Sequence, residues 1–336
     1  MLTRAAAIEG IGEGIEIVEL FRNVNVDWLG KKWYFLGFSL IFSVAGLISM
    51  GWHIAKIGSP VPLGVDFRGG TQVQLQFVNA PDVNGIRSAT EAAGIRDARI
   101  VGYDSPEKHE MLISLPEQSD ASVDTGRKQI VDALHAHYNN AFTVRNVQAV
   151  GPTVGKQLEK QAGLATLYSL LGMLVYLWFR FELIYGLAAV VAVFHDTLIT
   201  VGFFALFNKE ISLTVIAAIL TLVGYSMNDT IVVFDRIREN LRLSRREGLK
   251  EVVNRSINQT LSRTVLTSGL TFLTVLALYL FGGEVLNGFS FALVIGILIG
   301  TYSSIAVAAP MLVAYQDWRA GRGKAAVLPA SKRSKA

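Results

Sequence analysis

The chain has 336 residues, of which 51% are hydrophobic and 17% charged, and its formal net charge is +4. A soluble protein of this size carries more charge because its surface must stay hydrated, so the composition predicts a membrane protein. The absence of cysteine excludes disulfides and thiolate metal sites. No H-E-x-x-H pattern, phosphate-binding loop or nucleophile constellation occurs, so we expect no cofactor and no enzymatic activity. Basic residues lie in short segments beside apolar runs, which favours membrane topology over nucleic-acid binding.

Several apolar runs are long enough to cross a bilayer, which takes about 20 residues. The first extends from Trp33 to Trp52 and ends in aromatic residues, as spans do at membrane interfaces. Because no cleavable signal peptide precedes it, this span is expected to be the targeting signal. Further runs occupy 164–179, 183–207, 211–234, 264–281 and 288–315. A helix satisfies its own backbone groups in lipid, so we predict an all-α bundle of six transmembrane helices.

The positions of Lys and Arg in short loops predict the orientation in the membrane. The N-terminal segment, a long connection after the fourth span and the C-terminal tail are all basic, whereas the short loops on the other side contain only Lys209. We therefore predict a multi-pass protein of the plasma (inner) membrane with both termini in the cytoplasm. The predicted division has seven parts: a cytoplasmic segment (1–32), a first span (33–53), an extracytoplasmic domain (54–160), spans two to four (161–235), a basic cytoplasmic loop (236–263), spans five and six (264–315) and a cytoplasmic tail (316–336).

The extracytoplasmic region alternates strand and helix patterns. Residues 71–77 alternate polar and apolar side chains, which is typical of a half-buried strand. Asp82 is placed to cap a helix that Gly94 ends. Further elements are expected as strands at 98–103, 110–115 and 142–150 and as a helix at 124–138. The order β-α-β-β-α-β predicts a small α+β domain of the ferredoxin-like kind.

Glycine and proline residues flank this domain. Gly69 and Gly70 permit backbone angles that side chains forbid, which suits a tight entry into the first strand. Pro152 cannot donate to a strand ladder or sit inside a helix, so we expect it to break the chain before the second span. Gly151 and Gly155 add flexibility there, which is equally compatible with a hinge and with a simple linker.

Ionisable residues inside spans are the candidate functional groups, because each costs roughly 2.5–3.5 kcal/mol at the middle of a helix. His195 and Asp196 lie halfway along the third span, and Asn228 and Asp229 lie inside the fourth. Asp229 is about 10 Å from the cytoplasmic end of its span, which Arg236 marks. Desolvation would favour the protonated form of this carboxylate, and a nearby guanidinium would favour the charged form. A carboxylate between these two influences can load and release a proton.

Each candidate also has a purely structural interpretation. Asp229 is either a proton relay or a carboxylate tied permanently to a neighbouring helix, and the same alternatives hold for His195 and Asp196. Arg263 opens the fifth span and is either an ordinary basic flank or a long side chain that reaches inward to a carboxylate. A G-x-x-x-G pattern at 296–300 would allow close helix packing, either within the bundle or against a partner.

Four stretches of the chain carry distinctive motifs. The sequences GVDFRGGT and VGPTVG resemble the segments that the SecD/SecF family of protein translocase subunits has after the first span and before the second. GYSMNDTIVVFDRIREN and NQTLSRT, at 224–240 and 258–264, resemble segments of its SecF members. The family signature includes Asp66, Gly69, Gly70, Gly151 and Pro152. The resemblance extends from about residue 30 to 315.

The resemblance implies a role in protein export. Family members of the SecF type work with SecD as an RND-like unit beside the SecYEG channel and use the proton-motive force to assist the export of unfolded preproteins. The Asp of the N-D pair and the Arg of Q-T-L-x-R-T are needed for coupling, and they correspond here to Asp229 and Arg263, with Asn228 alongside. SecD would be a separate subunit, and YajC and YidC are further expected partners, with the lipid bilayer as surroundings.

Two other functional classes remain open. The chain could be half of an RND-type exporter of small or lipid substrates, although its outer domain is small for a large binding porter. It could instead be an assembly factor of the membrane without ion coupling. Both H⁺ and Na⁺ are candidates for the coupling ion.

Overall fold

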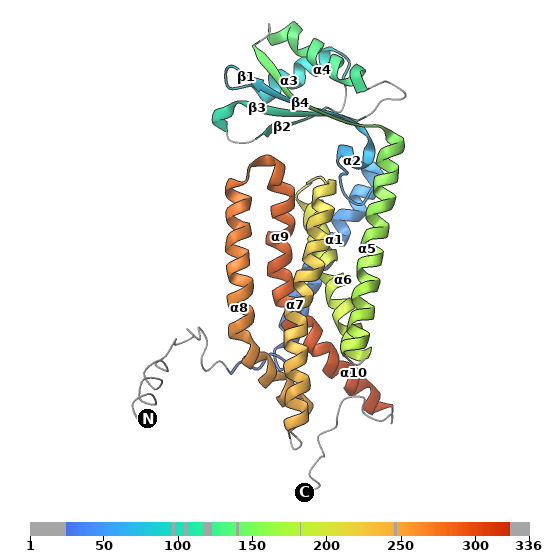
Figure 1. Ribbon diagram of the computed structural model, residues 1–336, viewed down its shortest axis with the longest axis vertical. Coiled ribbons are helices and arrows are strands. Elements are labelled where there is room, and N and C mark those ends of the chain that lie inside the picture. Colours follow the sequence, from blue (N-terminus) through green and yellow to red (C-terminus); the bar gives the residue numbers. More distant parts are fainter. Residues whose placement is uncertain are drawn as a thin grey trace, which may run out of the picture.

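The computed structural model describes residues 25–95, 98–103, 106–116, 123–138, 141–181, 183–244 and 247–322. The molecule is elongated, and a small sheet with two helices caps one end of a long helical bundle (Figure 1). The opposite end of the bundle, where α7 is followed by α8, is called the far end below. Six helical stretches among the described residues are long and apolar enough to cross a membrane, which confirms the predicted number.

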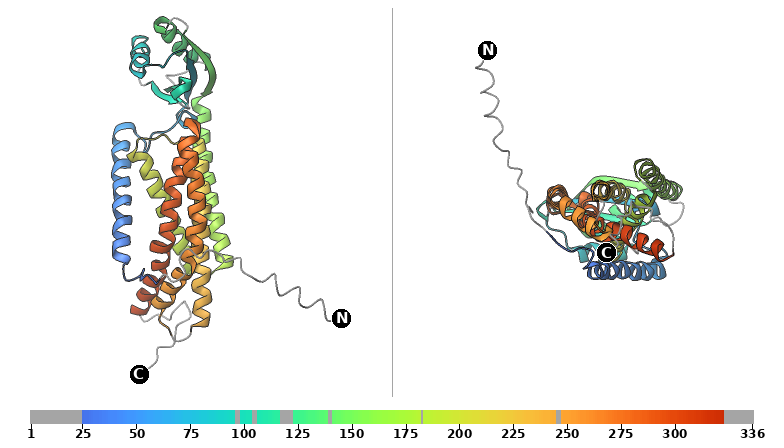
Figure 2. Two further views of the ribbon diagram at one scale, coloured as in Figure 1. Left: turned by 90° about the vertical axis from the view of Figure 1, so that its left-hand side faces the viewer. Right: turned by 90° about the horizontal axis from the view of Figure 1, so that it is seen from below.

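The bundle consists of long helices joined mostly by short connections. Its elements are α1 (Lys32–Ile57), α5 (Pro152–Arg180), α6 (Leu183–Leu206), α7 (Leu213–Leu243), α8 (Leu249–Phe281), α9 (Gly283–Ser303), the π-helical turn η3 (Ser304–Ala308) and α10 (Ala309–Gly321). The last spanning stretch, Val285–Arg319, contains α9, η3 and α10. Helix α1 stands at the side of the bundle (Figure 2) and packs on α6, with Gly46 opposite Gly202.

Two helical regions extend beyond the predicted spans. Helix α5 begins at Pro152, whereas the apolar run begins only at residue 164. The segment 236–263, expected as a basic loop, is mostly helical, because α7 continues to Leu243 and α8 starts at Leu249. Hydropathy marks where a helix leaves the lipid, and not where its hydrogen bonding ends, so it underestimated both helices.

The small domain contains a four-stranded antiparallel sheet in the order β2-β3-β1-β4. Its strands are β1 (Gly70–Phe77), β2 (Arg99–Tyr103), β3 (Glu110–Pro116) and β4 (Phe142–Val150), and its helices are α3 (Val83–Ala92) and α4 (Val123–Tyr138). A short 3₁₀ turn, η2 (Pro106–Lys108), precedes β3. The chain order of these strands and helices is the predicted one. Helices α3 and α4 cover the face of the sheet that points away from the bundle (Figures 1 and 2).

Alternation along the strands separates the two faces of the sheet. In β1, Val73 and Leu75 are completely buried and pack with residues of α3 and α4, while the intervening glutamines point to the other face. Val73 lies opposite Ile113 of β3, which is also completely buried. The predicted helix cap is confirmed, because the Asp82 carboxylate accepts hydrogen bonds from the backbone N–H groups of Asn84 and Gly85.

The junction between the domain and the bundle is tight. Gly69 and Gly70 have φ angles of +76° and +134°, which confirms the predicted tight entry into β1 after the short helix α2 (Val65–Arg68). Only Gly151 separates β4 from α5, and Pro152 is the first residue of α5, so there is no linker. A Cβ atom at Gly155 would lie 2.6 Å from the carbonyl oxygen of Phe67. Gly155 therefore provides close packing of α5 on α2, and the expectation that it adds flexibility is corrected.

Helices α7 and α9 form the centre of the bundle and approach each other at the G-x-x-x-G pattern. A Cβ atom at Gly300 would lie 3.0 Å from Cβ of Ser226, and one at Gly296 would overlap the side chain of Leu222. Of the two interpretations of this pattern, the structure selects packing within the bundle.

Candidate functional site

The carboxylate of Asp229 lies where α7, α8 and α9 meet. Inward-facing residues of α7 recur at helical spacing, and this places Asp229 on the buried face with only 2% of its surface exposed. Its Oδ2 atom accepts a hydrogen bond of 2.6 Å from the hydroxyl of Ser268 on α8. The hydroxyl of Thr301 on α9 lies 3.5 Å from the same oxygen.

This environment suits a group that changes its ionisation. In the described part of the chain, no Lys, Arg or His forms an ion pair with Asp229. Its partners are hydroxyls, which donate to a carboxylate and can rotate to accept from a carboxylic acid. Because neither form loses its hydrogen bonding, a proton can be added or removed without leaving a buried polar group unpaired.

Asn228 and Arg263 do not join Asp229 inside the bundle. Both side chains are exposed on the outer surface of their helices. Within the described residues, the guanidinium of Arg263 has neither an ion pair nor a hydrogen bond. Arg263 precedes Ser268 by more than one helical turn, and no ion pair joins it to Asp229 among the described residues.

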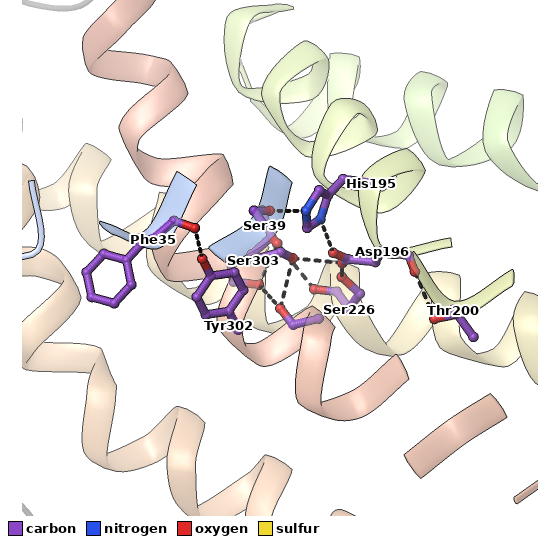
Figure 3. A network of polar contacts seen from close by, with 11 residues as sticks. Phe35, Ser39, His195, Asp196, Thr200, Ser226, Tyr302 and Ser303 are labelled. Carbon is purple, nitrogen blue, oxygen red and sulfur yellow. Dashed lines mark hydrogen bonds and ion pairs between the residues drawn. The ribbon is translucent and has the colours of Figure 1, made fainter. Parts of the chain in front are cut away.

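The other predicted pair, His195 and Asp196, is brought together on α6 (Figure 3). Nδ1 of His195 lies 2.9 Å from Oδ1 of Asp196, and the hydroxyls of Ser226 and Ser303 donate to Oδ2 at 2.5 and 2.7 Å. Nε2 of His195 hydrogen-bonds to Ser39 of α1. This cluster is therefore a contact point of four helices.

The signature residue Asp66 holds the sheet domain to the start of α7. Its Oδ2 atom accepts a 2.8 Å hydrogen bond from the backbone N–H of Leu213, the first residue of α7. The N–H of Gly64 donates to the carbonyl of Ile211, whose own N–H donates to the carbonyl of Pro62. The segment before β1 is thus fastened directly to the helix that carries Asp229.

Sequence reasoning missed the hydroxyl partners of both carboxylates. The missed residues are Ser39, Ser226, Ser268, Thr301 and Ser303. Thr264 and Ser268 do lie at i, i+4 along a predicted span, and this spacing marks one helix face. It could have indicated a polar helix contact opposite Asp229.

Comparisons with known proteins identify the family of this chain. The model described as protein export membrane protein SecD/SecF, C-terminal, matches residues 130–318, and that of the SecD/SecF GG motif matches residues 57–81. The chain belongs to the SecD/SecF family. This confirms the resemblance drawn from the sequence, and the GG motif includes Asp66, Gly69 and Gly70.

Individual relatives in this family are SecF subunits. The protein translocase subunit SecF of Koribacter versatilis is 54% identical, over 92% of this chain and 96% of its own length. That of Calditerrivibrio nitroreducens is 43% identical, over 90% and 99%. The crystal structure of SecDF from Thermus thermophilus, described as a translocon-associated membrane protein, matches with a TM-score of 0.76 and 39% identity over 88% of this chain. The chain spans only 39% of that structure's length. Family membership supports a role in protein export.

Proposed function

We propose that this chain is the SecF-type subunit of the Sec preprotein translocase and that it uses the proton-motive force, together with SecD, to assist protein export. The observation that carries the proposal is Asp229, a carboxylate with 2% exposure inside the spans that has hydroxyls and no ion pair as partners among the described residues. Intramembrane carboxylates of this kind mark ion pathways. A proton that crosses 100 mV releases about 2.3 kcal/mol, which is enough to shift the packing of helices by a population change.

A polar outer face on α7 and α8 supports a SecD partner. It comprises Thr221 and Asn228 of α7 and Arg263, Thr267 and Thr274 of α8, all exposed in this chain. The two helices join there, because the hydroxyl of Tyr225 donates to the carbonyl of Thr267. A guanidinium and an amide on a lipid-facing surface would be costly, so this face fits another protein. We propose that SecD covers it and supplies a carboxylate to Arg263, which completes the coupling site near Asp229.

The helix that carries Asp229 is connected directly to the sheet domain. Asp66 binds the first N–H of α7, and α5 continues directly from β4. Arg99 of β2 also forms a 2.5 Å ion pair with Glu210, just before α7. A shift of α7 after protonation of Asp229 would therefore act on the base of the sheet domain. We propose that the domain tilts in response and grips the emerging polypeptide.

The proposed setting follows from the same assignments. We propose that the sheet domain, whose strand order is β2-β3-β1-β4, is of the ferredoxin-like kind and lies outside the plasma (inner) membrane, and that both chain ends lie in the cytoplasm. The SecYEG channel, YajC and YidC are proposed neighbours, and the unfolded preprotein is the cargo. The chain acts as a transport subunit without a catalytic centre or a nucleic-acid partner.

The test is gradient-driven export by proteoliposomes that contain this chain, SecD and the channel. Asp229→Asn keeps the shape of the side chain but cannot ionise, so gradient-dependent export is expected to fall to the level seen without a gradient. Asp235→Asn is the matched control, because Asp235 is an exposed residue of the same helix that pairs with Arg180 at the far end. Imposing separate H⁺ and Na⁺ gradients identifies the ion.

The outcomes separate the functional classes. Unchanged export by Asp229→Asn and by the Asp229→Asn, Arg263→Met double variant would leave an assembly factor without ion coupling. Gradient-driven efflux of small or lipid substrates, with no effect on preprotein export, would instead support an RND-type exporter.

A further inference from the structure

The His195 and Asp196 cluster on α6 (Figure 3) contacts α7 through Ser226 and α9 through Ser303. Asp196 is only 1% exposed and Ser226 and Ser303 are equally buried, whereas the side chain of His195 is 15% exposed. The carboxylate accepts three hydrogen bonds: one from the imidazole and two from the hydroxyls. With an ionised Asp196 and a neutral imidazole, the cluster is a buried site of net charge −1.

The cluster can accommodate one additional proton. A proton on His195 would produce an imidazolium beside a carboxylate, with a net charge of zero, which lowers the desolvation cost of the site. Both ring N–H groups would then have acceptors, namely Asp196 and the hydroxyl of Ser39. Without that proton, the Ser39 hydroxyl can turn and donate to the free ring nitrogen. The cluster is hydrogen-bonded in both states.

The hydroxyl partners of Asp196 can also adapt. The hydroxyl of Ser303 lies 2.7 Å from the carboxylate and 3.1 Å from the carbonyl of Gly300, so it has a second acceptor when the charge is removed. Ser303 immediately precedes the π-helical turn η3. Such turns are rare and are frequently found at functional sites.

The same two helices connect this cluster to Asp229. On α7, Ser226 contacts Asp196 and lies one helical turn before Asp229. On α9, Ser303 contacts Asp196, and Thr301, two residues earlier, faces Asp229. The buried hydroxyls of Thr230 and Ser304 hydrogen-bond across the same contact at 2.8 Å. A change of packing at either carboxylate therefore acts on the helices that hold the other.

We propose that His195 and Asp196 together bind one proton during the transport cycle, as a second ion site linked to Asp229 through the α7–α9 contact. This inference rests on the proposed function. In this proposal His195, which is more exposed than Asp196 and lies beside α1, is the group that first takes the proton. The packing of α1 on the bundle then changes in response to that proton. Ser39 and the hydrogen bond from Tyr302 to the carbonyl of Phe35 hold α1 at this level.

Few other ionisable groups of the described chain face the cluster. Those that do so from the neighbouring helices are Asp229 of α7 and Tyr302 of α9. The charged residues of α1 lie near its ends. Helices α5 and α10, which also pack on α6, have their charged residues within about three turns of their ends. These residues are Lys32, His53, Lys56, Lys156, Glu159, Lys160, Arg180, Asp317 and Arg319. Protonation of the pair is therefore expected to respond mainly to the charge on Asp229.

The experiment combines a direct measure of proton binding with export. In lipid nanodiscs that contain this chain and SecD, ¹⁵N-labelled histidines are followed by NMR as the pH changes, and His195→Gln identifies the signal of His195 among the five histidines. We expect the signal of this imidazole to report the binding of a proton as the pH falls, and to do so differently in Asp229→Asn. In Asp196→Asn, which still offers an oxygen to both serines, we expect loss of this titration behaviour and of gradient-driven export.

The control is Ser290→Ala, because Ser290 is a completely buried hydroxyl of α9 that donates only to backbone carbonyls. Export by this variant should match the unmodified chain. Normal export by Asp196→Asn, when Asp229→Asn fails, overturns the second site and leaves the proposed function intact. Normal export by both variants overturns both. Loss of export in Asp196→Asn together with a His195 imidazole that does not titrate also overturns the inference, because the cluster would then be only a clamp on α1.

Discussion

The sheet domain and the bundle have opposite distributions of polar groups. In the sheet domain, the buried residues between sheet and helices are almost all apolar, and glutamines occupy the outer face of β1. In the bundle, Asp196 and Asp229 are buried with a set of hydroxyls, whereas Phe179 and Phe281 are 85% and 86% exposed. Lipid tails are as apolar as leucine, so apolar side chains give no hydrophobic drive between these helices. Substitutions in the core of the sheet domain should therefore change stability, whereas substitutions of the two buried carboxylates of the bundle should chiefly change function.

The largest effect on stability is expected in the core of the sheet domain. Ile113→Ala removes a completely buried side chain of β3 and should destabilise the domain by about 2–5 kcal/mol, because a cavity remains beside Val73. Hydrogen exchange of the amides in β1 and β3 measures this. The control Gln148→Ala changes an exposed residue of β4 and should stay within about 0.5 kcal/mol. Similar exchange in both variants would contradict the view that this core stabilises the domain.

A smaller effect is expected at the junction, where the two regions meet. Gly155→Ala places a methyl group against the backbone of Phe67 and should cost about 1–3 kcal/mol, since neither backbone can easily move away. Gly151→Ala is the matched control, because its Cβ would meet no atom within 4 Å. Thermal unfolding in mixed micelles compares the two. If both variants unfold alike, the junction is a loose hinge and the close packing of α5 on α2 does not contribute to stability.

Prediction from the sequence succeeded where neighbouring residues differ strongly in polarity. Alternating side chains located the strands, and Asp196 and Asp229 are conspicuous because charges are rare within apolar runs. The hydroxyl partners Ser226 and Ser268 were missed because serine is unremarkable in a span, and its role appears only when two helices are placed together. The choice between the two interpretations of Arg263 was left open for a related reason: a charged residue near a span end can face either way, and only the helix packing decides.

Within the bundle, one buried hydroxyl offers a way to gain stability. Oγ1 of Thr264 is buried on α8 and has no hydrogen-bond partner among the described residues. An unpaired buried polar group costs about 1–3 kcal/mol, so Thr264→Val should raise the unfolding temperature in micelles. Thr260→Val, one turn earlier, removes a hydroxyl that donates to backbone carbonyls and should give no such gain. A loss of stability in Thr264→Val would show that this hydroxyl has a partner, such as a bound water near the coupling site.

The smallest effect concerns an exposed carboxylate at the far end of the bundle, in contrast to the two buried ones. The backbone N–H of Gly30 and then the side-chain amide of Asn254 hold the pKa of Asp27 below its ordinary value of 3.8. A lowered pKa means that the contribution of Asp27 is complete above the ordinary value and is lost as the pH falls through the lowered one. Amide exchange at Leu29 and Gly30 should therefore accelerate in acid, relative to the amides of β1. In Asp27→Asn this additional acid response should disappear, and an unchanged response would assign the acid sensitivity to other groups at this end.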